Sequence, residues 1–267
     1  MNKDKKKILR LIVIIEVIVI LLIINFYLIA LLDDEFGTND TVQIKTQSET
    51  LVKNETTETP KKKKSLSAEA KKVAKTEKKQ TLLLVNSKHE IPEDYEVKLS
   101  TYKKKGKQVA TAILDPLEKM IEAGEKKGLS FAICSGYRSI SYQEKLFNRD
   151  VETYQNQGLS YEEAVEKTSE SVQPPKCSEH ATGYAVDIVS KENSNLDETQ
   201  EETEEFKWLK KHCYEYGFIL RYPDEKKKIT GITFEPWHFR YVGKKVAKFI
   251  TKNNLTLEEF TELVNKK

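Results

Sequence analysis

Residues 178–188 read SEHATGYAVDI and residues 235–241 read EPWHFRY, and these two stretches decide how the chain is interpreted. The first places six residues between His180 and Asp187, and the second places His238 three positions after Glu235. Two neutral imidazoles and one carboxylate suit Zn²⁺, and three protein ligands leave a fourth tetrahedral position open. Glu235 is close enough to a ligand in sequence to stand beside the metal as a general base without binding it.

Ordinary structural roles are the competing interpretation of these residues. A lone histidine on a strand usually forms a hydrogen bond with a common neighbour, and Asp187 alone could cap a loop. Spacing alone therefore favours a His–Asp–His zinc site and ordinary structural roles equally. The remaining histidines, His89 and His212, are predicted to be ordinary because no carboxylate in a turn or strand accompanies them. The chain has no HExxH motif, which excludes a thermolysin-like zinc helix.

The pattern around these stretches predicts a single α+β domain over residues 81–267. Apolar residues at helical spacing and short apolar runs are mixed without regular βαβ alternation. Helices are expected over residues 110–127, 141–149, 161–169, 202–216 and 255–265, the last with Thr256 as a possible N-cap. Strands are expected over residues 129–134, 183–189 and two short pieces of 232–242 hinged at Pro236.

The amino-terminal part of the chain differs in character from this domain. Residues 8–32 are almost entirely apolar, and as a helix they would be about 37 Å long, enough to cross a hydrocarbon core of about 30 Å. The run is longer than a signal-peptide core, and no A-x-A-like cleavage site follows Leu32, so an uncleaved transmembrane signal anchor is predicted. Lysines cluster in residues 1–7, which predicts a cytoplasmic stub, an extracellular domain and a single-pass protein of the cell membrane.

Residues 33–80 are rich in Thr, Lys and Glu, and are predicted to form a disordered extracellular stalk because they cannot bury enough apolar surface to offset their ordering entropy. Across the whole chain 45 Lys+Arg face 42 Asp+Glu, for a net charge of +3. That balance argues against a nucleic-acid partner, because proteins that bind nucleic acids usually carry a large excess of basic residues on one face. No obligate protein partner is evident from the sequence.

Five segments together resemble the VanY/LdcB-type D,D- and L,D-carboxypeptidases, zinc peptidases of bacterial peptidoglycan. They occur in order along the domain: SGYRS (135–139), SEHATGYAVDI (178–188), YGFILRYP (216–223), ITG (229–231) and EPWHFRYVG (235–243). The resemblance implies a small antiparallel sheet flanked by helices, a fold related to the D-Ala-D-Ala dipeptidases and the hedgehog signalling domain. It also implies a zinc cofactor and peptidoglycan stem peptides as the substrate.

Carried over position by position, the resemblance assigns roles to individual residues. His180, Asp187 and His238 would be the zinc ligands, and Glu235 the catalytic acid/base. Arg138 of SGYRS would hold the substrate's terminal carboxylate or the developing oxyanion, which suits the planar fork of a guanidinium. A structural salt bridge is the alternative for Arg138.

Further residues near these segments are candidates for substrate contact. Gln143 could donate a hydrogen bond to the same terminal group, and Ser178 could bond the substrate backbone, although helix capping or solvent contact fits both equally well. Tyr222 and Arg240 are candidates for lining the cleft, and a structural pair is the alternative for Arg240. Trp237 is expected to pack behind the site.

The function expected from these features is removal of the C-terminal D-alanine from stem peptides by a membrane-anchored zinc carboxypeptidase. Specificity for D,D or L,D bonds stays open, because pocket shape decides it. A peptidoglycan endopeptidase and a catalytically inactive wall-binding module are the alternatives on the same fold. Glu235 is present, which counts against the inactive module.

The three cysteines, Cys134, Cys177 and Cys213, contain no CxxC pair, which excludes a cysteine-rich zinc finger. The predicted extracellular location permits oxidation. A Cys177–Cys213 disulfide is one hypothesis and three free thiols the other. Cys177 as a fourth zinc ligand is discounted because Asp187 makes it unnecessary.

Overall fold

A computed structural model describes residues 60–103 and 106–266, with side chains placed from residue 64 onward. The predicted cytoplasmic stub and the predicted signal anchor at residues 8–32 lie outside these residues. Among the helices that the structure does describe, none combines the length and the apolar character needed to span a bilayer.

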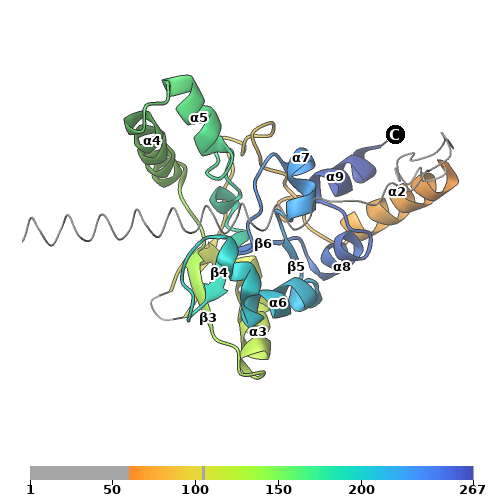
Figure 1. The fold of residues 1–267 in the computed structure, drawn as a ribbon. Coiled ribbons are helices and arrows are strands. Elements are labelled where there is room, and N and C mark those ends of the chain that lie inside the picture. Colours follow the sequence, from red (N-terminus) through yellow and green to blue (C-terminus); the bar gives the residue numbers. More distant parts are fainter. Residues whose placement is uncertain (1–59, 104–105, 267) are drawn as a thin grey trace, which may run out of the picture. The chain divides into compact units, whose positions relative to one another are not determined.

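The described residues form an α+β fold, as predicted (Figure 1). Its helices are α2 (Pro60–Ala74), α3 (Thr111–Glu125), α4 (Ile140–Asn156), α5 (Tyr161–Ser169), α6 (Glu204–His212), α7 (Lys227–Thr230), α8 (Lys244–Lys252) and α9 (Leu257–Asn265). Its strands are β1 (Leu99–Thr101), β2 (Gln108–Ala110), β3 (Phe131–Ser135), β4 (Ala185–Ser190), β5 (Phe218–Leu220) and β6 (His238–Tyr241). Short 3₁₀ turns are η1 (Glu179–Thr182), η2 (Glu198–Glu202), η3 (Cys213–Tyr216) and η4 (Asp224–Lys226).

The central sheet is antiparallel with the strand order β3-β4-β6-β5, and β1 and β2 form a separate two-stranded sheet. The register of β4 and β6 sets Asp187 directly opposite His238. The register of β3 and β4 sets Ser135 opposite Asp187, beyond an irregularity that follows Ile133. Directly opposed residues have neighbouring side chains on one face of a sheet. The pairing alone therefore brings two predicted metal ligands together.

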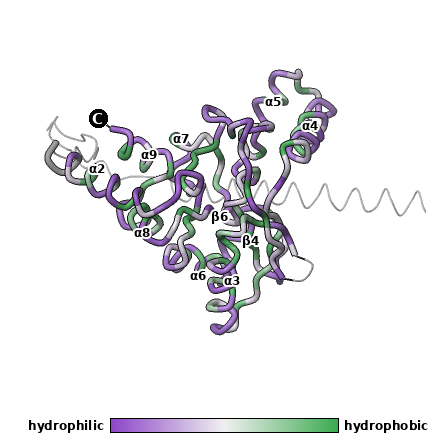
Figure 2. The backbone as a smooth tube through the Cα atoms, turned by 180° about the vertical axis from the view of Figure 1, so that it is seen from behind, coloured by the Kyte–Doolittle hydropathy of each residue, from purple (hydrophilic) through white to green (hydrophobic). Residues whose placement is uncertain are grey.

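The two faces of the sheet have different roles, because side chains alternate between faces along a strand. Val186, Ile188 and Phe239 belong to the main hydrophobic core together with residues of α3 and α6. Figure 2 shows hydrophobic stretches in these two helices and in the sheet beside them. Asp187 and His238, at the alternate positions, point away from this core. One face of the sheet thus supplies packing, and the other supplies the polar site.

Two of the predicted helices begin at capping boxes. Ser160 and Glu163 exchange side-chain and backbone hydrogen bonds at the start of α5. Thr256, the predicted N-cap, does the same with Glu259 at the start of α9. Such caps satisfy backbone N–H groups that have no partner within the helix. The helix predicted over residues 161–169 is confirmed with its bounds, and the helix predicted over residues 255–265 begins two residues later, after its N-cap Thr256.

The expectation of a disordered stalk reaching residue 80 is wrong for its last part. Helix α2 packs against α8 and α9, where Ala70 is fully buried and the Ser67 hydroxyl donates to the Leu263 carbonyl at 2.8 Å. Its apolar positions join a second hydrophobic cluster that contains Phe249 and Phe260. The segment of α2 has too few apolar residues to form a core by itself, and its packing against α8 and α9 stabilises it as a helix.

Two other expectations need correction. Only the second of the strand pieces expected in residues 232–242 forms, as β6, because the Thr233 and Glu235 amides donate instead to the carbonyls of Glu170 and Tyr222. The Cys177–Cys213 disulfide is absent, since both cysteines are free. Cys213 is buried within the main core, whereas Cys177 lies outside that cluster.

Candidate active site

One cavity of about 270 Å³ collects the proposed metal ligands, the proposed acid/base and the proposed substrate-contact residues, but not Arg240. It is lined by Arg138, Gln143, Ser178, His180, Asp187, Glu235 and His238. These residues come from β3–α4, η1, β4 and the approach to β6, so the fold unites segments about 100 positions apart. Tyr222 and Trp237 also line the cavity.

His180 is held in η1 by the turn that contains the SGYRS segment. Its Nδ1 lies 2.8 Å from the Gly136 carbonyl oxygen, which fixes Nδ1 as the protonated nitrogen and leaves the Nε2 lone pair free. A Cβ at Gly136 would lie 2.2 Å from the Gln108 carbonyl oxygen, so only glycine fits this turn. Burial lowers the pKa of His180, although Asp187 opposes the shift, and a lower pKa favours the neutral imidazole that metals bind.

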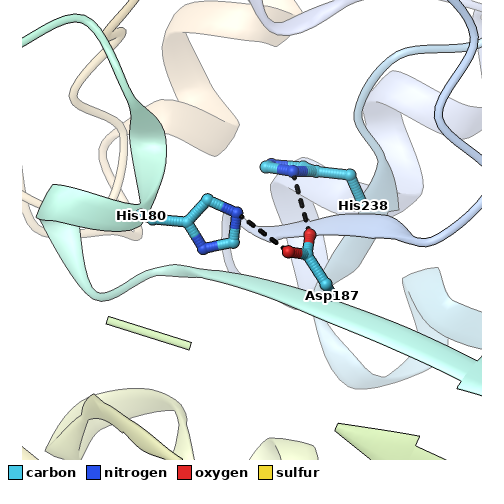
Figure 3. A group of neighbouring side chains, drawn as sticks. All are labelled: His180, Asp187 and His238. Carbon is cyan, nitrogen blue, oxygen red and sulfur yellow. Dashed lines mark ion pairs between the residues drawn. The ribbon is translucent and has the colours of Figure 1, made fainter. Parts of the chain in front are cut away.

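Asp187 lies between the two imidazoles (Figure 3). Its Oδ2 is 3.3 Å from His180 Nε2, and its Oδ1 is 3.3 Å from His238 Nδ1. The two histidine rings meet edge to face with centroids 4.9 Å apart. Burial would raise the pKa of Asp187, but the adjacent imidazoles hold it well below its ordinary value.

These three side chains fit a metal ion. One ligand atom from each lies within 4.8 Å of the others, and all three residues are buried. Asp187 Oδ1 is a buried carboxylate oxygen without a hydrogen-bond partner among the described residues. Such an atom is costly to bury unless a cation or donor compensates it. The donor set of two nitrogens and one oxygen is typical of a zinc site with an open coordination position.

Glu235 stands beside this group without belonging to it. Its Oε2 is 3.4 Å from His238 Nδ1, and the residue is 6% exposed. Burial raises the pKa of Glu235 to about 8, with Asp187 acting in the same direction and His238 against it. A carboxylate with a pKa near neutrality can both accept and return a proton.

Arg138 makes the structural contact that the sequence analysis held as an alternative, and it also faces the cavity. Its Nη2 donates to Asp187 Oδ2 at 2.7 Å and to Ser135 Oγ at 3.0 Å. Its Nη1 lies 3.4 Å from Gln143 Oε1, and the side chain is 19% exposed. Gln143 is itself buried, with its amide nitrogen bonded to the Gln173 carbonyl. The guanidinium is therefore held by partners on one side while it borders the cavity on the other.

The remaining candidates divide between the cavity and the protein interior. Ser178 precedes η1 and lines the cavity, and its side chain caps no backbone N–H of that turn. Tyr222 packs its ring 4.9 Å from that of His238, and burial raises its pKa well above the ordinary value. Trp237 is half-buried at the cavity wall. Arg240 is fully buried and bonds the carbonyls of Thr81 and Leu83, which is a structural role.

Glu179 was missed by the sequence analysis. It directly precedes His180, is only 1% exposed, and lines the same cavity. Its carboxylate pairs with Arg221 and Arg240, and these two guanidinium groups hold the pKa of Glu179 below its ordinary value although burial alone would raise it. No motif flags an acid of this kind, because both of its arginine partners are distant in sequence.

Comparisons with known proteins agree with this site. Residues 106–244 match the family model described as "VanY: D-alanyl-D-alanine carboxypeptidase". A Bacillus subtilis (strain 168) protein named "Putative carboxypeptidase YodJ" is 40% identical over 195 residues, which cover 69% of this chain and 68% of that protein. The family resemblance seen in the sequence is confirmed.

Two solved structures share the fold. A vancomycin-resistance D,D-pentapeptidase, VanY, solved in complex with Zn(II), has a TM-score of 0.62 and 34% identity over 68% of this chain and 99% of that one. The LdcB LD-carboxypeptidase has a TM-score of 0.61 and 38% identity over 70% of this chain and 88% of that one. The Zn(II) of the first relative agrees with the metal that the His–Asp–His group favours. The chain therefore belongs to the VanY family of D-alanyl-D-alanine carboxypeptidases.

Proposed function

We propose that this carboxypeptidase depends on zinc and removes the C-terminal D-alanine from peptidoglycan stem peptides, at D,D or L,D bonds. The observation that carries the proposal is the convergence of three kinds of group on one cavity. These are the metal-binding trio, the buried carboxylate of Glu235 and the guanidinium of Arg138. Each supplies a different requirement of peptide hydrolysis at a free carboxyl terminus.

The residues of this chain divide the chemistry between them. When bound, zinc supplies a Lewis acid that polarises the scissile carbonyl and acidifies the attacking water. Glu235, with its raised pKa and its place next to His238, takes the proton of that water and delivers it to the leaving D-alanine amine. Arg138 presents N–H donors to the terminal carboxylate of the substrate, which makes the reaction exo rather than endo.

The size of the cavity favours a short substrate segment. At about 270 Å³ it falls just below the 300–1,000 Å³ that is typical of sites for drug-sized ligands. It suits one or two small residues such as D-alanine. The relatives include a D,D-pentapeptidase and an LD-carboxypeptidase, so both bond types stay within the proposal.

We further propose that residues 8–32 anchor the enzyme in the cell membrane with its carboxypeptidase domain outside. The support is the length of the apolar run and the lysine cluster that precedes it. An external domain would be on the side of the membrane where peptidoglycan is located.

The purified full-length chain should release one D-alanine from a stem peptide in a zinc-dependent reaction. The assay incubates tetrapeptide and pentapeptide stems with and without a chelator, and identifies products by mass. Cleavage of the pentapeptide alone would define a D,D-enzyme, and cleavage of the tetrapeptide alone an L,D-enzyme. Internal cleavage would instead identify an endopeptidase. Zinc binding without any cleavage would identify a wall-binding module. Internal cleavage and zinc binding without cleavage would each contradict the proposal.

Replacement of Arg138 by lysine should lower kcat/KM for substrates with a free C-terminus by about 10- to 100-fold, the equivalent of one hydrogen bond to a charged group. Lysine keeps the charge but loses the planar fork. Amidated substrates lack the carboxylate that the fork would bind, so their kcat/KM should fall much less. Zinc content is measured in parallel, because Arg138 also contacts Asp187. Equal losses on both substrates with full zinc would show that Arg138 does not read the carboxylate.

A further inference from the structure

A buried group of four charges lies directly behind the metal-binding trio. Glu179 Oε1 is 2.8 Å from Arg221 Nε and 2.9 Å from Arg240 Nη1. The other end of Arg221 forms a fork with Glu258 of α9, with N–O distances of 2.9 and 2.6 Å. Two cations and two anions therefore balance in the interior, as buried charges must.

One carboxylate oxygen of this group is left over. Glu179 Oε2 is buried and has no hydrogen-bond partner among the described residues. The same holds for His238 Nε2, and these two atoms face one another at 3.5 Å. A buried donor and a buried acceptor that both lack a partner are costly separately. A single Nε2–H···Oε2 hydrogen bond would satisfy both.

The other ring nitrogen of His238, Nδ1, determines whether Nε2 carries the proton that this hydrogen bond needs. Nδ1 faces Asp187 Oδ1 at 3.3 Å, on the side of the metal trio. An imidazole that binds a metal through Nδ1 must carry its proton on Nε2. Metal binding would then direct the Nε2 proton at Glu179, where no other acceptor competes among the described contacts of that nitrogen.

We infer that Glu179 is a positioning residue for His238: it accepts a hydrogen bond from the Nε2–H group, fixes the tautomer and holds the Nδ1 lone pair toward the metal. Arg221 and Arg240 hold the other carboxylate oxygen of Glu179, Oε1, at 2.8 and 2.9 Å, which leaves Oε2 facing the histidine. The inference rests on the proposed zinc ligands and adds a residue that supports one of them. A purely structural role, in which Glu179 only neutralises Arg221 and Arg240, is the rival account.

Glu179→Gln in the full-length chain separates the two accounts. The variant keeps the size of the side chain but removes the ionised acceptor, so zinc affinity should fall by about 10- to 100-fold, as is usual when the outer partner of a metal ligand is lost. Affinity is measured by competition with a chelator, together with the rate of zinc loss. Thermal unfolding of the zinc-free protein reports the structural cost separately.

The matched control is Glu258→Gln. It removes a charge of the same kind from the same buried group, but Glu258 contacts Arg221 and Asn86 rather than His238. A structural role predicts similar losses of zinc affinity in both variants. A positioning role predicts that Glu258→Gln lowers the stability of the protein but changes its zinc affinity by less than about 10-fold. That is less than the loss expected when a hydrogen-bond partner of a metal ligand is removed. Similar losses in both variants, or unchanged affinity in folded Glu179→Gln, would overturn the inference.

A measurement on the unaltered chain keeps the test valid if the variant does not fold. In the zinc-loaded protein with ¹⁵N-labelled histidines, His238 should show a metal-bound Nδ1 and a protonated Nε2 in slow exchange. A metal-bound Nε2 would overturn the inference and leave the proposed function intact. Failure of the unaltered chain to bind zinc would contradict the proposed function itself.

Discussion

His180→Ala and His238→Ala should each abolish both stoichiometric zinc binding and carboxypeptidase activity. Each variant leaves only two of the three candidate ligands, and the neighbouring Asp187 loses one of the imidazoles that flank it at 3.3 Å. Loss of a residue that only hydrogen-bonds a metal ligand typically lowers metal affinity by about 10- to 100-fold. Loss of a ligand itself should lower zinc affinity by more than that. Zinc is measured as metal per chain after gel filtration, and activity as D-alanine release.

The chain offers its own controls for this experiment. His89 bonds the Asn86 side chain. Contrary to expectation, His212 does have a carboxylate partner in a turn, Glu215 of η3, at 2.8 Å. Neither His89 nor His212 lines the cavity. Alanine at these two positions should leave zinc content and activity unchanged. Full zinc in both His180→Ala and His238→Ala would refute the ligand set. Excess zinc should not restore activity to either variant, whereas it should restore activity to chelator-treated unaltered enzyme.

Local signals were sufficient to predict much of the fold. The bounds predicted for α5 match the structure because a Ser–Glu capping box starts the helix. Residues 202–216 were expected to form one helix, and Gly217 does end the segment with φ at 93°. Its last turn, however, is the 3₁₀ turn η3 rather than part of α6. Ends of helices often tighten in this way.

Elements that depend on distant partners could not be predicted locally. Helix α2 carries few apolar residues, and packing against α8 and α9 buries Ala70 and partly buries Leu66 and Val73. Strands β1, β2 and β5 have three residues each, too few to show a period. In each case tertiary packing decides the local structure.

The candidate site shows the same division. Residue spacing and the family resemblance were enough to assign Asp187 and His238 to one metal site, and in the structure strand pairing and side-chain alternation place them on one face of the sheet. The same alternation places Arg240 on the face of His238, two residues further along β6. Glu179 had no such signal, because an acid next to a histidine is usually exposed and its arginine partners, Arg221 and Arg240, lie on the β5–η4 connection and on β6. A buried charge group of this kind becomes visible only in three dimensions.

Glu235→Gln should lower turnover by about 10²- to 10⁴-fold, the usual contribution of general acid–base catalysis. Glutamine matches the shape of glutamate but cannot accept the proton of the attacking water or return one to the leaving amine. Turnover is measured at saturating substrate, so that a change in KM does not obscure the chemical step. Glu225→Gln, the same substitution at an exposed position outside the cavity, is the matched control.

Zinc content in Glu235→Gln tells whether Glu235 acts as a base or as a ligand. Glu235 approaches His238 Nδ1 at 3.4 Å but is not part of the trio whose ligand atoms cluster within 4.8 Å. Burial raises its pKa to about 8, so the ionised carboxylate is disfavoured at this position. A neutral amide matches the protonated form that this pKa favours without metal, so the variant should hold full zinc, and its zinc-free form should unfold at a temperature no lower than that of the zinc-free parent. Loss of zinc would make Glu235 a ligand, and full turnover would transfer the role of base to another group.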